Sequence, residues 1–370
     1  MSIKELVKIS RFYGKDPSFV LAGGGNTSYK DYKYLYVKAS GFSLFSIGEG
    51  GFVKLDRSAL SRIWEKEYPS DVDLREKQAL KDLTDSRADG ETKRPSVEAL
   101  LHAALPQKYI VHTHPAMVNG LTCSKDGCQI AEKLFGSRCM WIPSVSPGYV
   151  LAKAIKTQLA EHEEKYNLLP DIILLENHGM FVGAETTREI KAIHNYVIST
   201  LKKHIIRKPD FSLVRTSKEK IEKVYRRLKN YSAFKDSYIT SENNTEINAA
   251  IRNSTSFEKV HSSYTPDHTL YAGPEMLFVE DLESIEQDID KYRQRNKCYP
   301  KVIAVKMTGV FAIGSRENAS HIAMLFFLNA LKIAVYAESF GGYKFMDKEQ
   351  IDFIKNWEVE KFRSKVSLGK

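Results

Sequence analysis

The sequence predicts an α/β fold, in which helices pack in layers against a β-sheet. Strand-like and helix-like segments alternate over the first 204 residues, as is typical of layered α/β domains. The 370 residues are 42% hydrophobic and 11% aromatic, which is enough for a large buried core. The four cysteines are too few and too scattered for a disulfide scaffold, so we expect free thiols in a reducing compartment.

The elements of the first half follow from turn residues and apolar periodicity. Strands are expected at the β-branched and aromatic stretches 32–38, 51–55, 109–111 and 172–175. Helices are expected at 1–20, 58–67, 97–105, 149–166 and 186–204. A Gly-rich turn at 23–28 precedes the first strand, and the polar region 70–93 is assigned no element.

The second half repeats the spacing of the first at an offset of 130 residues. Gly179 aligns with Gly309, and a helix–strand–turn–strand–helix pattern surrounds both. We therefore expect a C-terminal degenerate repeat, in which Thr308 stands where the first copy has His178. The expected domains are a first domain at 1–210, a charged helix and linker at 211–255, and a partial repeat at 256–370.

Charge and hydropathy exclude several classes of protein. The net charge is +9, but basic residues are spread along the whole length and no nucleic-acid-binding motif stands out. The charge suits small phosphorylated metabolites equally well. The apolar stretch 322–337 is shorter than a membrane span and carries Asn329 and Lys332, so it predicts a buried helix. No signal peptide is recognisable, and we expect a cytoplasmic protein with no nucleic-acid or membrane partner.

Three histidines at the ends of predicted strands point to a metal site. His112 and His114 are two residues apart in an extended segment, so their side chains share one face. His178 follows another apolar strand and completes a set of three nitrogens. Such a set with an open position suits a catalytic Zn²⁺, and other divalent metals also fit. A His-x-His pair alone is more often a core or surface feature, so the hypothesis depends on the third histidine.

Glu98 has two interpretations. It lies near the start of the helix expected at 97–105, just before the strand that carries His112. Beside a cation, a carboxylate can ligate the ion or move a proton on a bound substrate. In the first turn of a helix, it can equally serve only to stabilise the helix dipole.

The loop at 23–28, with Ser40, Gly41 and Ser96, has residue types that hold a phosphate. Glycines let backbone N–H groups approach an anion, and Asn and Ser side chains add donors. The segment GGGNTS lacks both the Lys-Ser/Thr ending of a P-loop and the later glycine of a dinucleotide fingerprint. A Gly-rich segment can also be only a turn.

These motifs, in this order, resemble those of the class II aldolase/adducin family. That family shares a G-N-x-S loop, a strand ending in S/T-G, an S-x-E helix start, an HxHP pair and a later NHG. The corresponding residues here are 25–28, 40–41, 96–98, 112–115 and 177–179. The GGGNTS form looks most like the aldolase half of bifunctional rhamnulose-1-phosphate aldolase/dehydrogenase proteins. Residues 266–274 and 338–342 share this likeness more weakly.

The resemblance implies a fold and a set of site residues. The implied fold is a three-layer α/β/α sandwich around a mostly antiparallel sheet. His112, His114 and His178 match the zinc ligands of the family, and Glu98 matches its catalytic acid/base. The positions that hold the substrate phosphate are matched by Gly25, Asn26, Ser40, Gly41 and Ser96. Relatives are often tetramers, so a homo-oligomer, tetramer or dimer, is expected.

The sequence also departs from the family pattern. No dinucleotide fingerprint follows the aldolase region, so a dehydrogenase half is not expected. Val97 stands where relatives often have a second Ser, which implies fewer phosphate contacts. Several relatives contribute a tyrosine from a partner chain, and Tyr264, Tyr271 and Tyr343 are only candidates for it.

The resulting hypothesis is a zinc-dependent aldolase acting on a rhamnulose-1-phosphate-like ketose. It would yield glycerone phosphate and an aldehyde through a metal-stabilised enediolate. The same chemistry serves a sugar-phosphate 4-epimerase or an oxo-acid phosphate decarboxylase of the same family. A non-catalytic, adducin-like interaction protein is the third alternative, and the intact histidine set with Glu98 argues against it.

Overall fold

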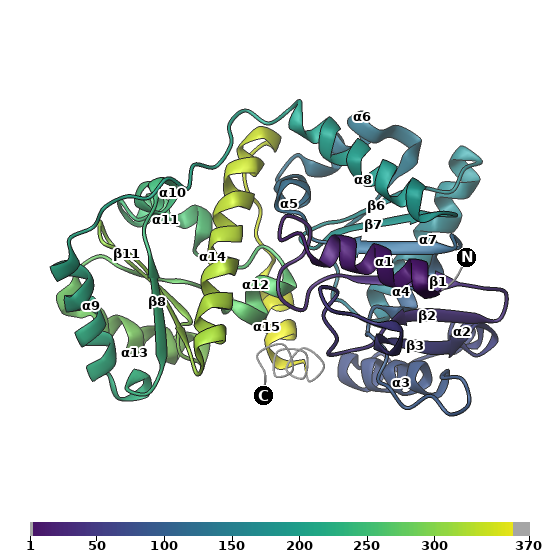
Figure 1. Cartoon of the computed structure of the whole chain (residues 1–370), viewed down its shortest axis with the longest axis horizontal. Coiled ribbons are helices and arrows are strands. Elements are labelled where there is room, and N and C mark those ends of the chain that lie inside the picture. The colour runs from purple at the N-terminus through teal and green to yellow at the C-terminus, as the bar shows by residue number, and fades with distance from the viewer. Residues whose placement is uncertain (1–2, 358–370) are drawn as a thin grey trace. The chain divides into compact units, whose positions relative to one another are not determined.

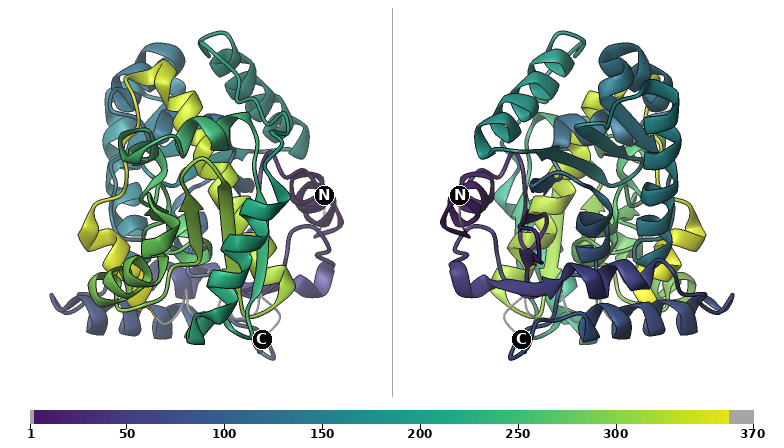
Figure 2. Two further views of the ribbon diagram at one scale, coloured as in Figure 1. Left: turned by 90° about the vertical axis from the view of Figure 1, so that its left-hand side faces the viewer. Right: turned by 90° about the vertical axis from the view of Figure 1, so that its right-hand side faces the viewer.

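The computed structural model describes residues 3–357, which form two compact units (Figures 1 and 2). The first unit comprises the described residues of 1–118 and 127–204, and the second those of 119–126 and 205–370. None of the four cysteines, all of which lie in the described residues, forms a disulfide, as the composition predicted.

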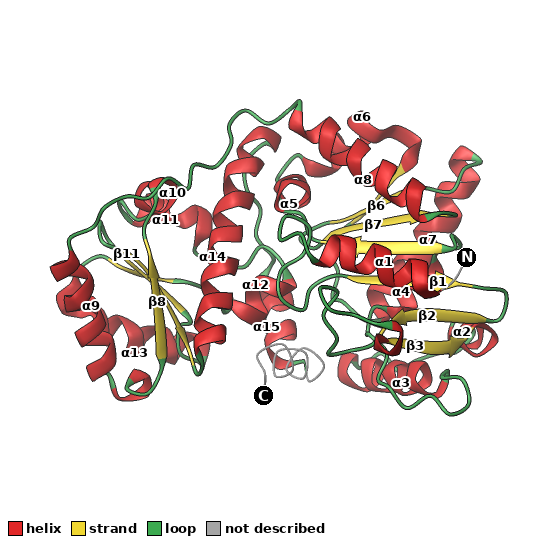
Figure 3. Cartoon of the chain, in the orientation of Figure 1, coloured by secondary structure: helices red, strands yellow, loops and turns green. Residues whose placement is uncertain are grey.

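Helices and strands alternate along the first 204 residues (Figure 3). The helices are α1 (Ile3–Gly14), α2 (Arg57–Ile63), α3 (Val72–Asp85), α4 (Ala99–Ala104), α5 (Ala116–Thr122), α6 (Gly127–Phe135), α7 (Tyr149–Tyr166) and α8 (Thr187–Lys202). The strands are β1 (Asn26–Lys30), β2 (Tyr34–Lys38), β3 (Phe52–Asp56), β4 (Tyr109–Thr113), β5 (Cys139–Ile142), β6 (Ile172–Leu175) and β7 (Gly179–Ala184). The predicted α/β class is confirmed.

The rest of the described chain adds a smaller sheet with its own helices. The helices are α9 (Lys218–Asn230), α10 (Thr245–Ala250), α11 (Ser254–Phe257), α12 (Pro266–Tyr271), α13 (Ile285–Asn296), α14 (Glu317–Ala337) and α15 (Lys348–Asn356). The strands are β8 (Tyr238–Glu242), β9 (Leu277–Val279), β10 (Val302–Val305) and β11 (Gly309–Gly314).

The seven strands of the first unit form one sheet in the order β3-β2-β1-β4-β7-β6-β5. Neighbouring strands are antiparallel except for β5 and β6, which are parallel. Helices cover both faces, and β4 shows how. Ile110 packs in the apolar cluster that includes residues of α2, α3, α4 and α7. Its neighbour Tyr109 instead donates its hydroxyl to Glu5 on α1, at 3.0 Å. Because successive strand residues point to opposite faces, the sheet lies between two helical layers (Figure 1).

Local chemistry sets the ends of the longer helices. Helix α7 ends at Tyr166, and the left-handed backbone of the C-cap residue Asn167 closes its last turn. Helix α8 begins with a capping box, in which the Thr186 side chain accepts the Glu189 N–H and the Glu189 side chain accepts the Thr186 N–H.

The sheet of the second unit has the order β8-β11-β10-β9, with only β9 and β10 parallel. Helices α9 and α13 pack on it through an apolar cluster that includes Phe311 of β11. Helix α14 contacts β8, β10 and β11. Its length and composition alone would allow it to cross a membrane, but 67% of its most apolar window is buried, which is typical of a core helix.

The structure differs from the expectation in several segments: α1 ends at Gly14 instead of near residue 20, β1 begins inside the expected turn 23–28, and no element was expected at α5, α6 and β5. Helix α3 lies in the polar region that was assigned no element. The sequence did not predict this helix because only three of its residues are buried, Glu76, Ala79 and Leu83, and one of them is charged. The range 211–255 was expected to be a helix and linker. It contains α9, β8 and α10, and β8 pairs with β11 to complete a sheet, so its backbone is part of the second unit.

Arg207 and Arg227 offer a matched test of what stabilises the second unit. Arg207 bridges Glu338 and Glu246, and Glu246 is 2% exposed. Arg227 bridges Glu283 and Glu286, whose side chains are 61% and 38% exposed. We expect Arg207→Ala to lower the free energy of unfolding by about 1–3 kcal/mol, because it leaves a buried carboxylate without its cation.

The control, Arg227→Ala, is expected to cost only about 0–1 kcal/mol, as exposed ion pairs do. Urea unfolding of both variants measures the difference. An equal loss of unfolding free energy in the two variants would contradict the expectation that the burial of Glu246 increases the contribution of its ion pair with Arg207.

Candidate metal centre

The register of the central strands brings the candidate residues to one edge of the first sheet. Asn26 at the start of β1 pairs with His112 near the end of β4. Thr113 pairs with Met180 of β7, just after the turn that holds His178. Asn26, His112 and the turn that holds His178 therefore lie close together although they are far apart in sequence.

The three histidines singled out in the sequence lie together at this edge. Nε2 of His112 is 2.8 Å from Nε2 of His114 and 3.3 Å from Nε2 of His178. Nδ1 of His112 donates to the carbonyl of Met180 at 2.9 Å, so in the neutral ring Nε2 carries a lone pair that faces the other two histidines. Burial lowers the pKa of His112, which keeps the ring neutral.

The donor set fits a divalent cation. The ligand nitrogens of His112, His114 and His178 all lie within 4.8 Å of one another. Tetrahedral zinc with Zn–N bonds of about 2.0–2.1 Å places its nitrogens about 3.3 Å apart. The three histidines therefore form a group that could hold a metal ion.

Glu98 completes the arrangement. It is 7% exposed, and its Oε1 lies 3.2 Å from Nε2 of His178 and 3.5 Å from Nε2 of His112. Burial alone would raise the pKa of Glu98, whereas protonated imidazoles at His112 and His178 would hold this pKa well below its usual range. Its side chain makes no capping hydrogen bond at the start of α4, so its contacts favour the site over the helix terminus.

The residues expected to hold phosphate lie around the same edge. Gly25 and Gly41 have positive φ angles, 65° and 88°, which glycine adopts without strain. The Ser40 N–H donates to the carbonyl of Arg94 at 2.9 Å, which holds this turn beside the start of α4. Ser96 lies at that start, and its Oγ accepts the N–H of Glu98 at 3.3 Å.

Asn26 contacts Glu98 directly, and its other side-chain contact is His102, a residue that the sequence analysis did not single out. Asn26 Nδ2 donates to Oε2 of Glu98, while Asn26 Oδ1 contacts Nε2 of His102. One N–H of the Asn26 amide remains for a ligand. The available signal for His102 was its position four residues after Glu98, on the same face of the expected helix.

Gly179 tests whether the position of His114 matters for the site. A Cβ at Gly179 would lie 2.6 Å from the carbonyl oxygen of Thr113 and 2.7 Å from Cδ2 of His114. We expect Gly179→Ala to displace His114 and weaken zinc binding about 10–100-fold, as changes around metal ligands do. Gly183→Ala is the control on the same strand, because its Cβ would meet only the movable side chain of Gln107.

Zinc titration of both variants, with circular dichroism as a check on folding, measures the effect. Equal zinc affinity in the two folded variants would contradict a role for the His114 position.

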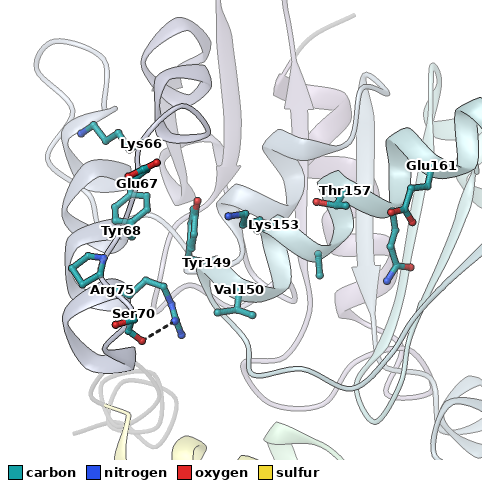
Figure 4. Close-up of a pocket in the computed structure, with 13 residues that line it drawn as sticks. Lys66, Glu67, Tyr68, Ser70, Arg75, Tyr149, Val150, Lys153, Thr157 and Glu161 are labelled. Atoms are coloured by element: carbon teal, nitrogen blue, oxygen red, sulfur yellow. Dashed lines mark hydrogen bonds between the residues drawn. The ribbon is translucent and has the colours of Figure 1, made fainter.

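A separate cavity of about 740 Å³ lies between α3 and α7 (Figure 4). Its lining includes Lys66, Arg75 and Lys153 but also Glu67 and Glu161, so side chains of both charges face it. None of the residues expected at the site lines it. The convergent donors at the sheet edge therefore define the candidate site.

Fold and donor set together define an α/β protein with a candidate metal centre at a sheet edge. The profile of the Class II Aldolase and Adducin N-terminal domain matches residues 4–203, more than half of the chain. The chain therefore belongs to the class II aldolase and adducin family, as the motifs predicted.

The chain is also similar to a curated protein over part of that protein's length. The uncharacterized oxidoreductase YuxG of Bacillus subtilis (strain 168) is 31% identical over 194 residues, which is 50% of this chain and 27% of that protein. The chain thus matches about a quarter of that relative's length.

Two solved structures are also similar. The N-terminal class II aldolase domain of a conserved protein from Thermoplasma acidophilum is 29% identical, with a TM-score of 0.47, over 55% of this chain and 94% of that one. An L-fuculose 1-phosphate aldolase is 18% identical, with a TM-score of 0.38, over 60% of this chain and 92% of that one.

Proposed function

We propose that this protein is a zinc-dependent class II aldolase. It cleaves a phosphorylated ketose, similar to rhamnulose 1-phosphate, to glycerone phosphate and an aldehyde. One observation carries the proposal: three imidazole Nε2 atoms and Oε1 of Glu98 converge on one point in a chain of this family.

The residues of the site take distinct roles in this reaction. His112, His114 and His178 hold the cation, and the lone pair of His112 is directed to it by the Met180 carbonyl. When bound, the cation supplies Lewis-acid stabilisation of the negative charge that develops on the ketose oxygens. Oε1 of Glu98 moves the proton at the carbon that becomes nucleophilic when the C–C bond breaks.

The glycine and serine turns hold the phosphate. Gly25 and Gly41 offer backbone N–H groups, and Ser40, Ser96 and Asn26 offer side-chain donors at the same edge. Backbone N–H groups in such turns form anion-binding concavities without a P-loop sequence. Together with the metal, they select a substrate that carries both a phosphate and adjacent oxygen donors.

A panel of phosphorylated ketoses, assayed with added Zn²⁺, tests the proposal. A new aldehyde with glycerone phosphate supports the aldolase. An inverted carbinol would identify a 4-epimerase instead, and released CO₂ a decarboxylase. Substoichiometric metal in protein purified without chelator, together with no turnover, would favour a non-catalytic interaction protein.

The second unit is proposed to be a degenerate repeat of the same type. The hairpin of β10 and β11 pairs Ile303 with Phe311, as the hairpin of β6 and β7 pairs Ile173 with Phe181, at the expected offset of 130 residues. Thr308 then takes the place of His178, so this copy keeps the hairpin without the metal histidine.

The context of the enzyme is also proposed. We propose a homo-oligomer, tetramer or dimer, in the cytoplasm, with a catalytic domain at 1–210 and a C-terminal domain at 256–370, whose sheet is completed by β8 from the range 211–255. Tyr264, Tyr271 and Tyr343 stay candidates for a tyrosine given to a partner's site, and Tyr264 and Tyr271 are buried within the described chain. Size-exclusion chromatography with light scattering tests the oligomer.

A further inference from the structure

His102 lies at the buried end of a chain of hydrogen bonds that reaches Glu98. It lies on α4, four residues after Glu98, and its side chain is fully buried. Its Nδ1 is 2.7 Å from Oγ of Ser28, and its Nε2 contacts Oδ1 of Asn26. Nδ2 of Asn26 in turn donates to Oε2 of Glu98. The hydrogen bonds therefore connect Ser28, His102, Asn26 and the carboxylate of Glu98, in that order.

The carboxylate at its end fixes the direction of each hydrogen bond. An ionised Glu98 only accepts, so Asn26 turns its NH₂ group toward it and its oxygen toward His102. Because an amide oxygen also only accepts, Nε2 of His102 must carry the hydrogen. Burial, and next the charge of Lys30, lower the pKa of His102 well below its ordinary value. The ring is therefore neutral, and its Nδ1 accepts from the hydroxyl of Ser28.

These hydrogen bonds give the two oxygens of the Glu98 carboxylate different contacts. Oε2 is held by Asn26, whereas Oε1 faces the metal histidines, 3.2 Å from His178 and 3.5 Å from His112. A proton carrier must be held within about 10–20° of its productive orientation. A neutral histidine acting through an amide fixes that orientation without adding a positive charge of its own, which would make the carboxylate a weaker base.

We propose that His102 is a positioning residue that acts through Asn26 to fix which oxygen of Glu98 faces the three histidines. The inference rests on the proposed role of Glu98 as the proton carrier. His102 does not touch the substrate, because it is fully buried and its ring packs against Phe181 at 5.3 Å. Phe181 stacks on His112 at 4.0 Å, between His102 and the metal histidine.

Three substitutions of His102 separate positioning from packing. His102→Leu fills the space but donates to nothing, and we expect kcat to fall about 10–100-fold with zinc content and KM nearly unchanged. His102→Gln places an amide N–H near the position of Nε2 and is expected to restore kcat to within about threefold of the wild type. His102→Asn reaches Ser28 but not Asn26, so it should behave like the Leu variant.

Two results would overturn the proposal in this assay. One is a kcat for the Leu variant equal to that of the wild type. The other is an equal loss of kcat in all three variants at equal melting temperature. That result would show that His102 contributes only through packing and not through its hydrogen bond to Asn26.

A second measurement requires no turnover and no change at position 102. In zinc-loaded, ¹⁵N-labelled wild-type protein, long-range ¹H–¹⁵N spectra should show His102 as a single tautomer with the proton on Nε2. In Glu98→Leu, the acceptor at the end of the chain is gone, so His102 should populate both tautomers. An Nδ1-protonated ring in the wild type, or no change in Glu98→Leu, would refute the coupling. If the wild type cleaves no ketose phosphate, the proposed function is wrong. The spectroscopic test still shows whether His102 is coupled to Glu98 through Asn26.

Discussion

Replacing Glu98 by Gln is expected to lower kcat on the ketose phosphate that the wild type cleaves by about 10²–10⁴-fold, the usual contribution of a general acid or base. The substitution keeps the shape of the side chain. The new amide can keep its oxygen toward Asn26 only by turning its NH₂ group toward His112 and His178. No basic oxygen then faces the substrate. Zinc content should stay at the wild-type value, because the three imidazoles are untouched.

Glu76→Gln is the matched control for this experiment. Glu76 and Glu98 are both 7% exposed, but Oε2 of Glu76 accepts the N–H of Tyr149 at the start of α7, away from the metal histidines. Its substitution should leave kcat unchanged. Steady-state kinetics and atomic absorption on both variants decide the question. A Glu98→Gln enzyme with wild-type kcat would remove Glu98 from the mechanism, and an equal loss in both variants would point to general disturbance of the fold.

The parts of the fold that were predictable have strong local boundaries. Strand β6 was placed to the residue, because Pro170 precedes it and a turn follows it. Helix α7 was also placed to the residue, between Gly148 and a left-handed Asn167. Helix α3 begins with the local signal of an N-cap Asp71, but its single buried stripe includes the charged Glu76, so its apolar periodicity is weak. Strand β8 was missed because its pairing with β11 bridges about 70 residues of sequence.

The site was predictable where local geometry sets it. His112 and His114 share a face because they are two residues apart in an extended segment, and His178 lies in the turn that follows a recognisable strand. The position of His102 behind Asn26 was not predictable, because these residues are 76 positions apart and meet only when α4 packs against β1. The same holds for Gly179, whose small size matters only because Thr113 and His114 lie against it.

Replacing His178 by Ala is expected to abolish both zinc retention and turnover. Two imidazoles remain, and a catalytic zinc site needs three protein ligands, so the affinity should fall by more than the roughly 10–100-fold loss typical of changes behind the ligands. Binding to the folded state stabilises it by about 4 kcal/mol when free zinc is 1,000 times the dissociation constant. The melting temperature of the wild type should therefore rise with added zinc, and that of His178→Ala should not.

His162→Asn is the matched control, because the two histidines are equally buried, at 8% exposed, while Nε2 of His162 contacts only the carbonyl of Ser137 at 2.8 Å. It should keep both the zinc-dependent rise in melting temperature and one zinc ion per chain after dialysis. Differential scanning fluorimetry with metal analysis reads both quantities on the same samples. If His178→Ala still binds zinc as tightly as the wild type, the ion is held elsewhere. The convergence of the three imidazoles at the sheet edge would then have another cause.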